Sequence, residues 1–223
     1  MAEPAFYGEM RRMSDPVWKA IFDHPFVKGI GDGTLPRDRF EFFLKQDYVY
    51  LIDFSRVVAL AAAKSGTLPD MGTFAALLHV TLNTEMELHR KTCAEFGIPE
   101  RELAETRKSR ITSAYTDLLV RTCYEGDVSD ILAVLVPCAC GYVEIGKKLK
   151  SQAFPANRFY RDWIDTYSSA EFGELADWLI EKMNEHADGA PARSRERWYR
   201  LYESSARYEY LFFDMSWKME EER

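Results

Sequence analysis

Two carboxylates and one cysteine in this sequence are of the types that perform acid, base or nucleophilic chemistry. Asp47 and Glu209 each fall within an apolar helical stripe, which would turn them toward the interior. The stripes contain Phe43, Leu44, Tyr50, Leu51 and Phe54 in one case, and Trp198, Tyr202, Ala206, Phe212, Phe213 and Ser216 in the other. A buried carboxylate is paired, hydrogen-bonded or held neutral, and the neutral form supplies a general acid or base. A structural pairing with a tyrosine, an arginine or a helix end is the alternative.

Cys138 follows Pro137 in an apolar segment and shares a helix face with Tyr142, four residues later. A proline inside a helix removes one hydrogen bond and bends the axis, which could turn backbone groups into a cavity. Because a buried cysteine is more often an inert hydrophobe, the spacing alone does not favour a nucleophile. The four cysteines have neither a disulfide framework nor zinc-ligand spacing; they are Cys93, Cys123, Cys138 and Cys140.

The histidines do not repeat at a metal-ligand spacing; they are His24, His79, His89 and His186. His89 follows Glu85 by four residues, whereas carboxylate di-iron bundles use Glu-x-x-His on two helices. We therefore expect no metal and no cofactor. His24, which precedes Pro25, is expected to cap a helix or anchor a loop rather than to bind haem.

These residues must be positioned by helices, because most of the chain has a period near 3.6 residues. Helices are predicted over about 36–65, 70–96, 113–124, 129–150, 159–167, 170–187 and 194–221. Residues 24–36, with three glycines and two prolines, are predicted to form a shaped loop. No repeat or linker divides the chain, so the sequence predicts one all-α helical bundle over residues 1–223.

Composition narrows the possible functions. The net charge of -7 disfavours binding to nucleic acid, which requires clustered basic side chains. The absence of about 18 consecutive apolar, uncharged residues disfavours a membrane role, and we expect a cytoplasmic protein. Aromatic residues make up 14% of the chain and include twelve tyrosines, which suit either an aromatic core or a pocket for a flat ring.

Several blocks of sequence occur in an order typical of one family. They are HPFVKGIGDGTLP with RFEFFLKQDYVYL, then LVPCACGYVEIGKKL, WIDTY and YEYLFFDMSW. Together they resemble the TenA family of thiaminase II and aminopyrimidine aminohydrolases. The resemblance implies a haem-oxygenase-like bundle without haem, usually a homotetramer, with a pocket for a 4-amino-2-methylpyrimidine ring. Because Cys138 is present, the chain resembles the cysteine-containing subgroup.

The resemblance also implies roles for individual residues. Cys138 corresponds to the nucleophile, Glu209 to the acid/base residue and Asp47 to the carboxylate that holds the amino face of the pyrimidine. The aromatic positions expected to bind or line the pocket are Tyr50, Tyr115, Tyr142, Tyr167 and Phe212. The small residues Ala139, Cys140 and Gly141 replace bulky side chains common in the family, which bears on pocket volume and substrate preference.

The reaction implied is hydrolysis of 4-amino-5-aminomethyl-2-methylpyrimidine, and of thiamin, to 4-amino-5-hydroxymethyl-2-methylpyrimidine in thiamin salvage. Three alternatives remain at this point. They are a transcriptional regulator, a thiamin- or pyrimidine-binding protein with little turnover, and an oxygenase or cofactor-processing enzyme on the same bundle. The acidic charge weighs against direct DNA contact by the first.

Overall fold

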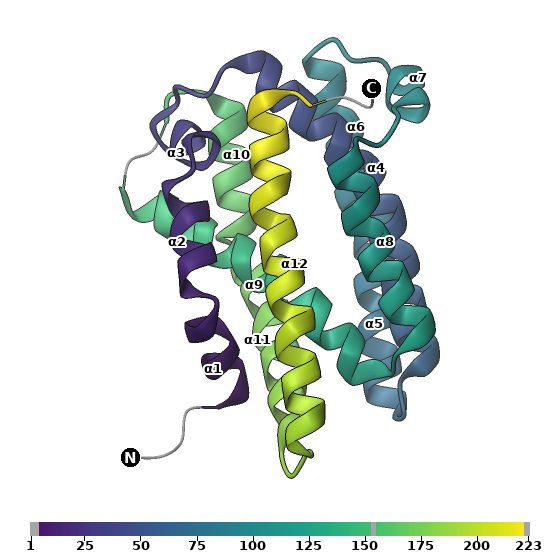
Figure 1. Ribbon diagram of the computed structural model, residues 1–223. Coiled ribbons are helices and arrows are strands. Elements are labelled where there is room, and N and C mark those ends of the chain that lie inside the picture. The colour runs from purple at the N-terminus through teal and green to yellow at the C-terminus, as the bar shows by residue number, and fades with distance from the viewer. Residues whose placement is uncertain (1–4, 153–154, 221–223) are drawn as a thin grey trace. The chain divides into compact units, whose positions relative to one another are not determined.

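The computed structural model describes residues 5–152 and 155–220, and every secondary-structure element in these ranges is a helix (Figure 1). The elements are α1 (Phe6–Met13), α2 (Asp15–Asp23), α3 (Pro25–Asp32), α4 (Arg37–Lys64), α5 (Leu68–Val80), η1 (Thr81–Glu85), α6 (Met86–Glu95), α7 (Glu100–Glu105), α8 (Arg110–Glu125), α9 (Val128–Gln152), α10 (Arg158–Tyr167), α11 (Ala170–Ala187) and α12 (Ala192–Lys218). The predicted all-α class is confirmed.

The contacts between residues divide the chain into two compact units. Unit 1 contains the residues up to Leu35 and those from Leu132 to Trp217. Unit 2 contains Pro36 to Ile131 and the residues from Lys218 onward. A single domain over the whole chain stays a prediction, and each unit is described separately below.

Part of the loop that the sequence predicted at residues 24–36 forms the helix α3. The Nδ1 atom of His24 accepts a hydrogen bond from the backbone of Phe26 at 3.2 Å, which caps the helix start as expected of this histidine. A Cβ at Gly31 would lie 2.7 Å from Leu149 Cδ2, so this glycine permits close packing inside a helix. The prediction was wrong because glycine was taken as a helix breaker, where packing required its small size.

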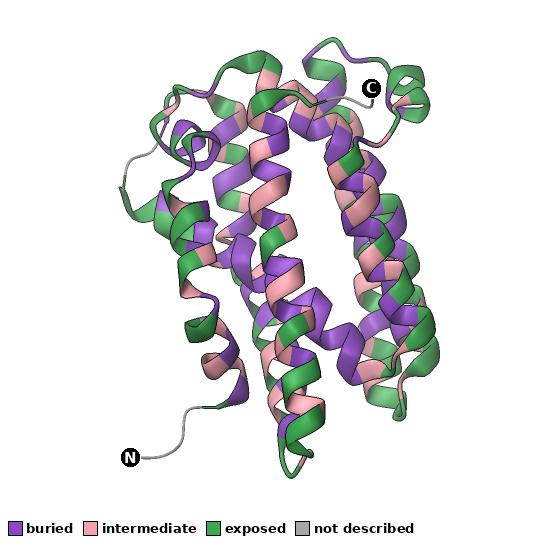
Figure 2. Ribbon diagram, viewed as in Figure 1, coloured by how far each residue is buried: buried purple, intermediate pink, exposed green. Residues whose placement is uncertain are grey.

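The helix α9 belongs to unit 1 from Leu132 onward, and it continues through Pro137. By length and composition it could cross a membrane, but 83% of its most apolar window is buried inside the structure, as is typical of a core helix. Figure 2 shows the buried residues along this helix. At its surface the guanidinium of Arg11 bonds both carboxylate oxygens of Glu144, at 2.8–3.1 Å, which joins α1 to α9.

The small residues after Cys138 serve the packing of this core. A Cβ at Gly141 would lie 2.2 Å from Trp18 Cη2, so the indole of α2 fills the space that a larger side chain would take. The thiol of Cys140 donates to the carbonyl oxygen of Ala176 on α11 at 3.7 Å. Within unit 1, Gly141 therefore makes room for α2, and Cys140 bonds to α11.

In unit 2 the long helix α4 packs against α5, α6 and α8. Gln46 fixes the start of α8, because its Oε1 accepts from the backbone of Ser109 at 2.9 Å and from the hydroxyl of Thr112 at 2.7 Å. Its amide nitrogen donates to the carbonyl oxygen of Arg107 at 3.0 Å. Gln46, the residue before Asp47, thus joins α4 to the start of α8.

Candidate active site

Two contacts in unit 1 determine how α9 and α12 lie against each other. The hydroxyl of Ser205 donates to the carbonyl oxygen of Val134 at 2.8 Å, and the rings of Phe213 and Tyr142 lie 5.9 Å apart between centroids. Residue numbers rise together along both helices between these contacts. The two helices therefore run in the same direction, in register over eight residues.

Cys138 and Glu209 occupy the midpoint of this paired stretch. Each is four residues, roughly 6 Å of helix rise, from both contacts. Positions four apart share a helix face, so each of these side chains lies on the face that its helix turns toward the other. Glu209 is buried, with 3% exposure, whereas Cys138 is partly exposed. The structure thus places the predicted nucleophile and the predicted acid/base residue at the same level of two paired helices.

The four cysteines, all within the described residues, differ in accessibility. Cys93, Cys123 and Cys140 are buried, and Cys138 is partly exposed. Burial raises the pKa of Cys93 and of Cys123 to about 12, and it also raises the pKa of Cys140. Because a thiol reacts as its thiolate, these three cysteines are poor nucleophiles at neutral pH.

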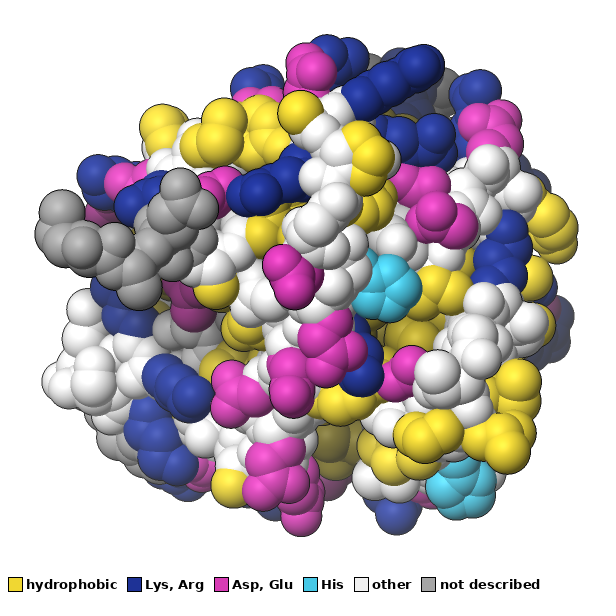
Figure 3. Space-filling view, turned by 90° about the horizontal axis from the view of Figure 1, so that it is seen from below, with side chains coloured by type: hydrophobic (Ala, Val, Ile, Leu, Met, Phe, Trp, Pro, Cys, Tyr) yellow, Lys and Arg dark blue, Asp and Glu magenta, His cyan; other side chains and the backbone are white. Residues whose placement is uncertain are grey.

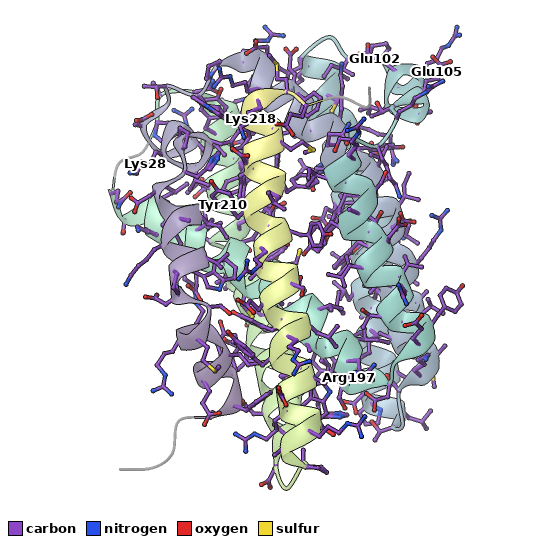
Figure 4. All side chains as sticks on the ribbon, in the orientation of Figure 1. Lys28, Glu102, Glu105, Arg197, Tyr210 and Lys218 are labelled. Atoms are coloured by element: carbon purple, nitrogen blue, oxygen red, sulfur yellow. The ribbon has the colours of Figure 1, made fainter. Side chains whose placement is uncertain are left out.

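Several aromatic rings of unit 1 pack against one another near Tyr142. Tyr142 and Tyr167 lie 4.7 Å apart between centroids, and Trp163 lies 4.7 Å from Tyr167. Phe212 is also buried. On the helix that carries Glu209, Tyr210 lies edge-on to His24, with 5.5 Å between the ring centroids (Figure 4 labels Tyr210). The predicted tyrosines of α9 and α10 therefore belong to one aromatic cluster.

In unit 2, Asp47 is buried and bonded to a histidine. Its Oδ2 lies 2.7 Å from Nε2 of His89 on α6, and both side chains are more than nine-tenths buried. Burial by itself lowers the pKa of His89, but the hydrogen bond with Asp47 and the charges of Asp47 and Glu85 outweigh it and raise the pKa. The contact with Asp47 therefore favours the protonated form of the His89 imidazole.

Glu85 is the second carboxylate beside this histidine. It ends η1, a π-helical turn between α5 and α6, where the sequence had predicted one uninterrupted helix. Burial raises the pKa of Glu85 to about 7; the charge of His89 opposes this rise and that of Asp47 adds to it. Such π turns are frequent at functional sites.

The other predicted residues of unit 2 lie near one another. Tyr50 and Tyr115 are buried, with their ring centroids 5.2 Å apart. A third buried carboxylate, Asp53 on α4, pairs with Lys108 and Arg56. Although burial opposes it, hydrogen bonding to Lys108 and Arg56 lowers the pKa of Asp53. Asp53 is thus held in structural ion pairs. A structural pairing was the alternative that the sequence left open for Asp47.

The predicted site residues divide between the units. Unit 1 holds Cys138, Tyr142, Tyr167, Glu209 and Phe212, and unit 2 holds Asp47, Tyr50 and Tyr115. The sequence reasoning missed the pairing of His89 with Asp47, because no local spacing relates two residues 42 positions apart. Among the residues that the structure describes, no group of three or more His, Cys, Asp or Glu side chains could hold a metal ion.

The raised pKa of Glu85 predicts a pH-dependent stability. The folded protein retains the proton of Glu85 up to about pH 7, whereas the unfolded chain releases it near its ordinary pKa of 4.5. The contribution of Glu85 to the free energy of unfolding is therefore complete below pH 4.5, and it is lost as the pH rises to about 7. Glu85→Gln, which cannot ionise, is expected to unfold with a free energy higher than wild type by on the order of 2 kcal/mol above pH 7.

Urea unfolding at pH 4.5, 6 and 8 measures this difference. Glu87 provides the matched control, because its carboxylate pairs with Arg90 at the surface and hydrogen bonding to Arg90 lowers its pKa. Glu87→Gln is expected to give no gain at high pH. Equal stability of Glu85→Gln and wild type at every pH would contradict the prediction.

Comparison with known proteins shows which family this chain belongs to. Residues 11–219 match the TENA/THI-4/PQQC family. The chain belongs to this family. An aminopyrimidine aminohydrolase of Halalkalibacterium halodurans, a family relative, is 41% identical over 214 residues, which is 96% of each protein. The predicted family is thereby confirmed.

Solved structures agree with this family assignment. A structure described as a TenA family transcription regulator, from a Silicibacter species, has a TM-score of 0.89 and 34% identity, covering 97% of this chain and 99% of that one. A domain of Shewanella denitrificans with a haem-oxygenase-like fold has a TM-score of 0.70 at 13% identity, covering 96% of this chain and 90% of that one. The second likeness concerns the fold alone and confirms the predicted haem-oxygenase-like class.

Proposed function

We propose that this protein is an aminopyrimidine aminohydrolase, which converts 4-amino-5-aminomethyl-2-methylpyrimidine to its 5-hydroxymethyl derivative and also cleaves thiamin. The observation that carries the proposal is the 41% identity to a relative of that name over 96% of both proteins. The pairing of α9 with α12 supports it, because a partly exposed thiol and a buried carboxylic acid occur at one level of two facing helices. Both groups suit addition chemistry on a ring.

In the proposed reaction, the sulfur of Cys138 forms a bond to the pyrimidine carbon beside a ring nitrogen, and Glu209 donates a proton to that nitrogen. The electron-rich ring then expels ammonia, or the thiazole of thiamin, from the exocyclic methylene. Water adds to this methylene and loses a proton. Return of the proton from the ring nitrogen to Glu209 restores aromaticity as the carbon–sulfur bond breaks and the thiolate of Cys138 leaves.

The remaining residues of the proposal bind the ring. Asp47 accepts a hydrogen bond from the amino group of the pyrimidine, and the contact between its Oδ2 and Nε2 of His89 supports an oriented carboxylate. Tyr142 and Tyr167 stack on the ring or bond to it, as their shared aromatic cluster supports. We assign Tyr50, Tyr115 and Phe212 to lining the pocket.

A chromatographic assay of the wild-type protein tests this function. Incubation with 4-amino-5-aminomethyl-2-methylpyrimidine, and separately with thiamin, is expected to yield the hydroxymethylpyrimidine from both. The ratio of kcat/KM for the two compounds identifies the preferred substrate, and we expect it to be the aminopyrimidine. Binding of the product without turnover of either compound would support instead a pyrimidine-binding protein.

We further propose a homotetramer in the cytoplasm. Apolar side chains on α5, η1 and α6 are exposed in the single chain, and their burial against other copies would stabilise an assembly; they are Leu68, Met71, Val80, Leu82 and Leu88. Figure 3 shows exposed hydrophobic side chains among charged ones. Light scattering coupled to size-exclusion chromatography is expected to give four times the mass of one chain, and a monomer mass would refute the assembly.

The description of the Silicibacter structure as a transcription regulator raises a second function. The net charge of -7 opposes direct binding to DNA, because phosphate contacts depend on basic side chains. A gel shift at physiological ionic strength is expected to show no complex. A salt-sensitive complex with duplex DNA would favour the regulator.

A further inference from the structure

We propose that His89 is a positioning residue for Asp47, holding its Oδ2 so that Oδ1 meets the amino group of a pyrimidine. The inference rests on the proposed function, in which Asp47 binds the substrate. His89 itself does not touch the reacting atoms in this assignment. Its role is to determine where the carboxylate of Asp47 points.

The geometry of the pair supports this role. The Nε2–Oδ2 distance is 2.7 Å, and both side chains are more than nine-tenths buried. A carboxylate can only accept hydrogen bonds, so Nε2–H donates to it. The imidazole of His89 also makes a hydrogen bond with the backbone of Glu85, one turn earlier. The ring is therefore held from two sides, and through it the carboxylate of Asp47.

The backbone before His89 supports the same conclusion. An α-helix turns about 100° per residue, so the wider π turn of η1 changes the face that α6 presents to α4. A regular helix from α5 into α6 would point residue 89 in another direction. The π turn thus places the imidazole opposite Asp47, a residue 42 positions earlier in the chain.

The pair also differs from a purely structural tie between helices. Asp53, on the same helix as Asp47, is joined to the flexible ammonium of Lys108 and to the guanidinium of Arg56. The flexible side chain of Lys108 can adapt to the carboxylate of Asp53. The imidazole of His89 is planar and makes two hydrogen bonds, so it imposes one orientation on Asp47. An oriented acceptor is what recognition of an amino group requires.

Two substitutions separate positioning from packing. His89→Leu removes the donor, and His89→Gln retains an N–H at nearly the position of Nε2. The steady-state kinetics of 4-amino-5-aminomethyl-2-methylpyrimidine hydrolysis and the calorimetric Kd of the hydroxymethylpyrimidine are measured for each. His79 supplies the control, because it is exposed on α5 and bonds to Asn83; His79→Gln is expected to match wild type.

For His89→Leu we expect KM and Kd to rise about 10- to 100-fold, as for loss of a hydrogen bond to a charged group, with a smaller change in kcat. His89→Gln is expected to return both constants to within about threefold of wild type. In an Asp47→Ala background, His89→Leu is expected to change neither constant further. Thermal melting of each variant verifies that it is folded.

Three outcomes would overturn the inference. Wild-type KM and Kd in a folded His89→Leu variant would do so while leaving the proposed function intact. Equal losses in the leucine and glutamine variants, in step with lower melting temperatures, would show that His89 only packs the core. A wild-type protein that neither binds nor hydrolyses the pyrimidine would refute the proposed function and this inference together.

Discussion

Cys138→Ser is expected to lower kcat for aminopyrimidine hydrolysis by about a thousandfold or more, while the protein still binds the hydroxymethylpyrimidine. A serine hydroxyl is nearly the size of the thiol, so the pocket keeps its shape. It ionises far less readily than a thiol and adds poorly to a ring carbon. Single-turnover kinetics and calorimetric binding of the product separate the loss of chemistry from any loss of affinity.

Cys140 is the matched control for this substitution. It lies on the same helix, but it is buried and its thiol donates to the backbone of Ala176. A serine at position 140 can make the same hydrogen bond, so Cys140→Ser is expected to retain kcat within a few-fold. Full activity in Cys138→Ser would eliminate the nucleophile assignment.

Glu209→Gln is expected to lower kcat by about a hundredfold or more, the usual contribution of a general acid or base. Glutamine preserves the size of the side chain and its capacity for hydrogen bonds, but it cannot transfer a proton to the ring nitrogen. KM should change little, because binding does not depend on that transfer. The pH profile of kcat is expected to lose the limb that reports this carboxyl group.

Glu203 serves as the control, because it lies on the same helix and pairs with Arg207 near the surface. Glu203→Gln should leave kcat and its pH profile unchanged, since a surface ion pair contributes little. An unaltered pH profile in Glu209→Gln would show that another group transfers the proton. Measuring both variants with the aminopyrimidine and with thiamin also tests whether one acid serves both leaving groups.

The sequence predicted most helices, because their boundaries depend on local features. The predicted helix over residues 36–65 is α4 (Arg37–Lys64), and that over 170–187 is α11. The interior positions of Asp47 and Glu209 were also predictable. A charged residue within a 3.6-residue apolar stripe must share the burial of its neighbours.

Packing between helices was beyond this local reasoning. The glycines of α3 were read as signals of a loop, although Gly31 lies in a helix, where an added Cβ would be 2.7 Å from Leu149 Cδ2. The effect of the small residues after Cys138 on the pocket stays a prediction, whereas the close approach of Gly141 to Trp18 is known only from the structure. In both cases the partner that explains the glycine is more than a hundred residues away.

The sequence by itself determined the helical class, the faces that are buried and, through its motifs, the family. Tertiary structure decided that Cys138 and Glu209 lie at one level of two parallel helices. It also decided that Asp47 pairs with His89. Helical periodicity specifies the direction of a side chain relative to its own axis. It carries no information about the neighbouring helix or its register, which depend on side-chain packing throughout each unit.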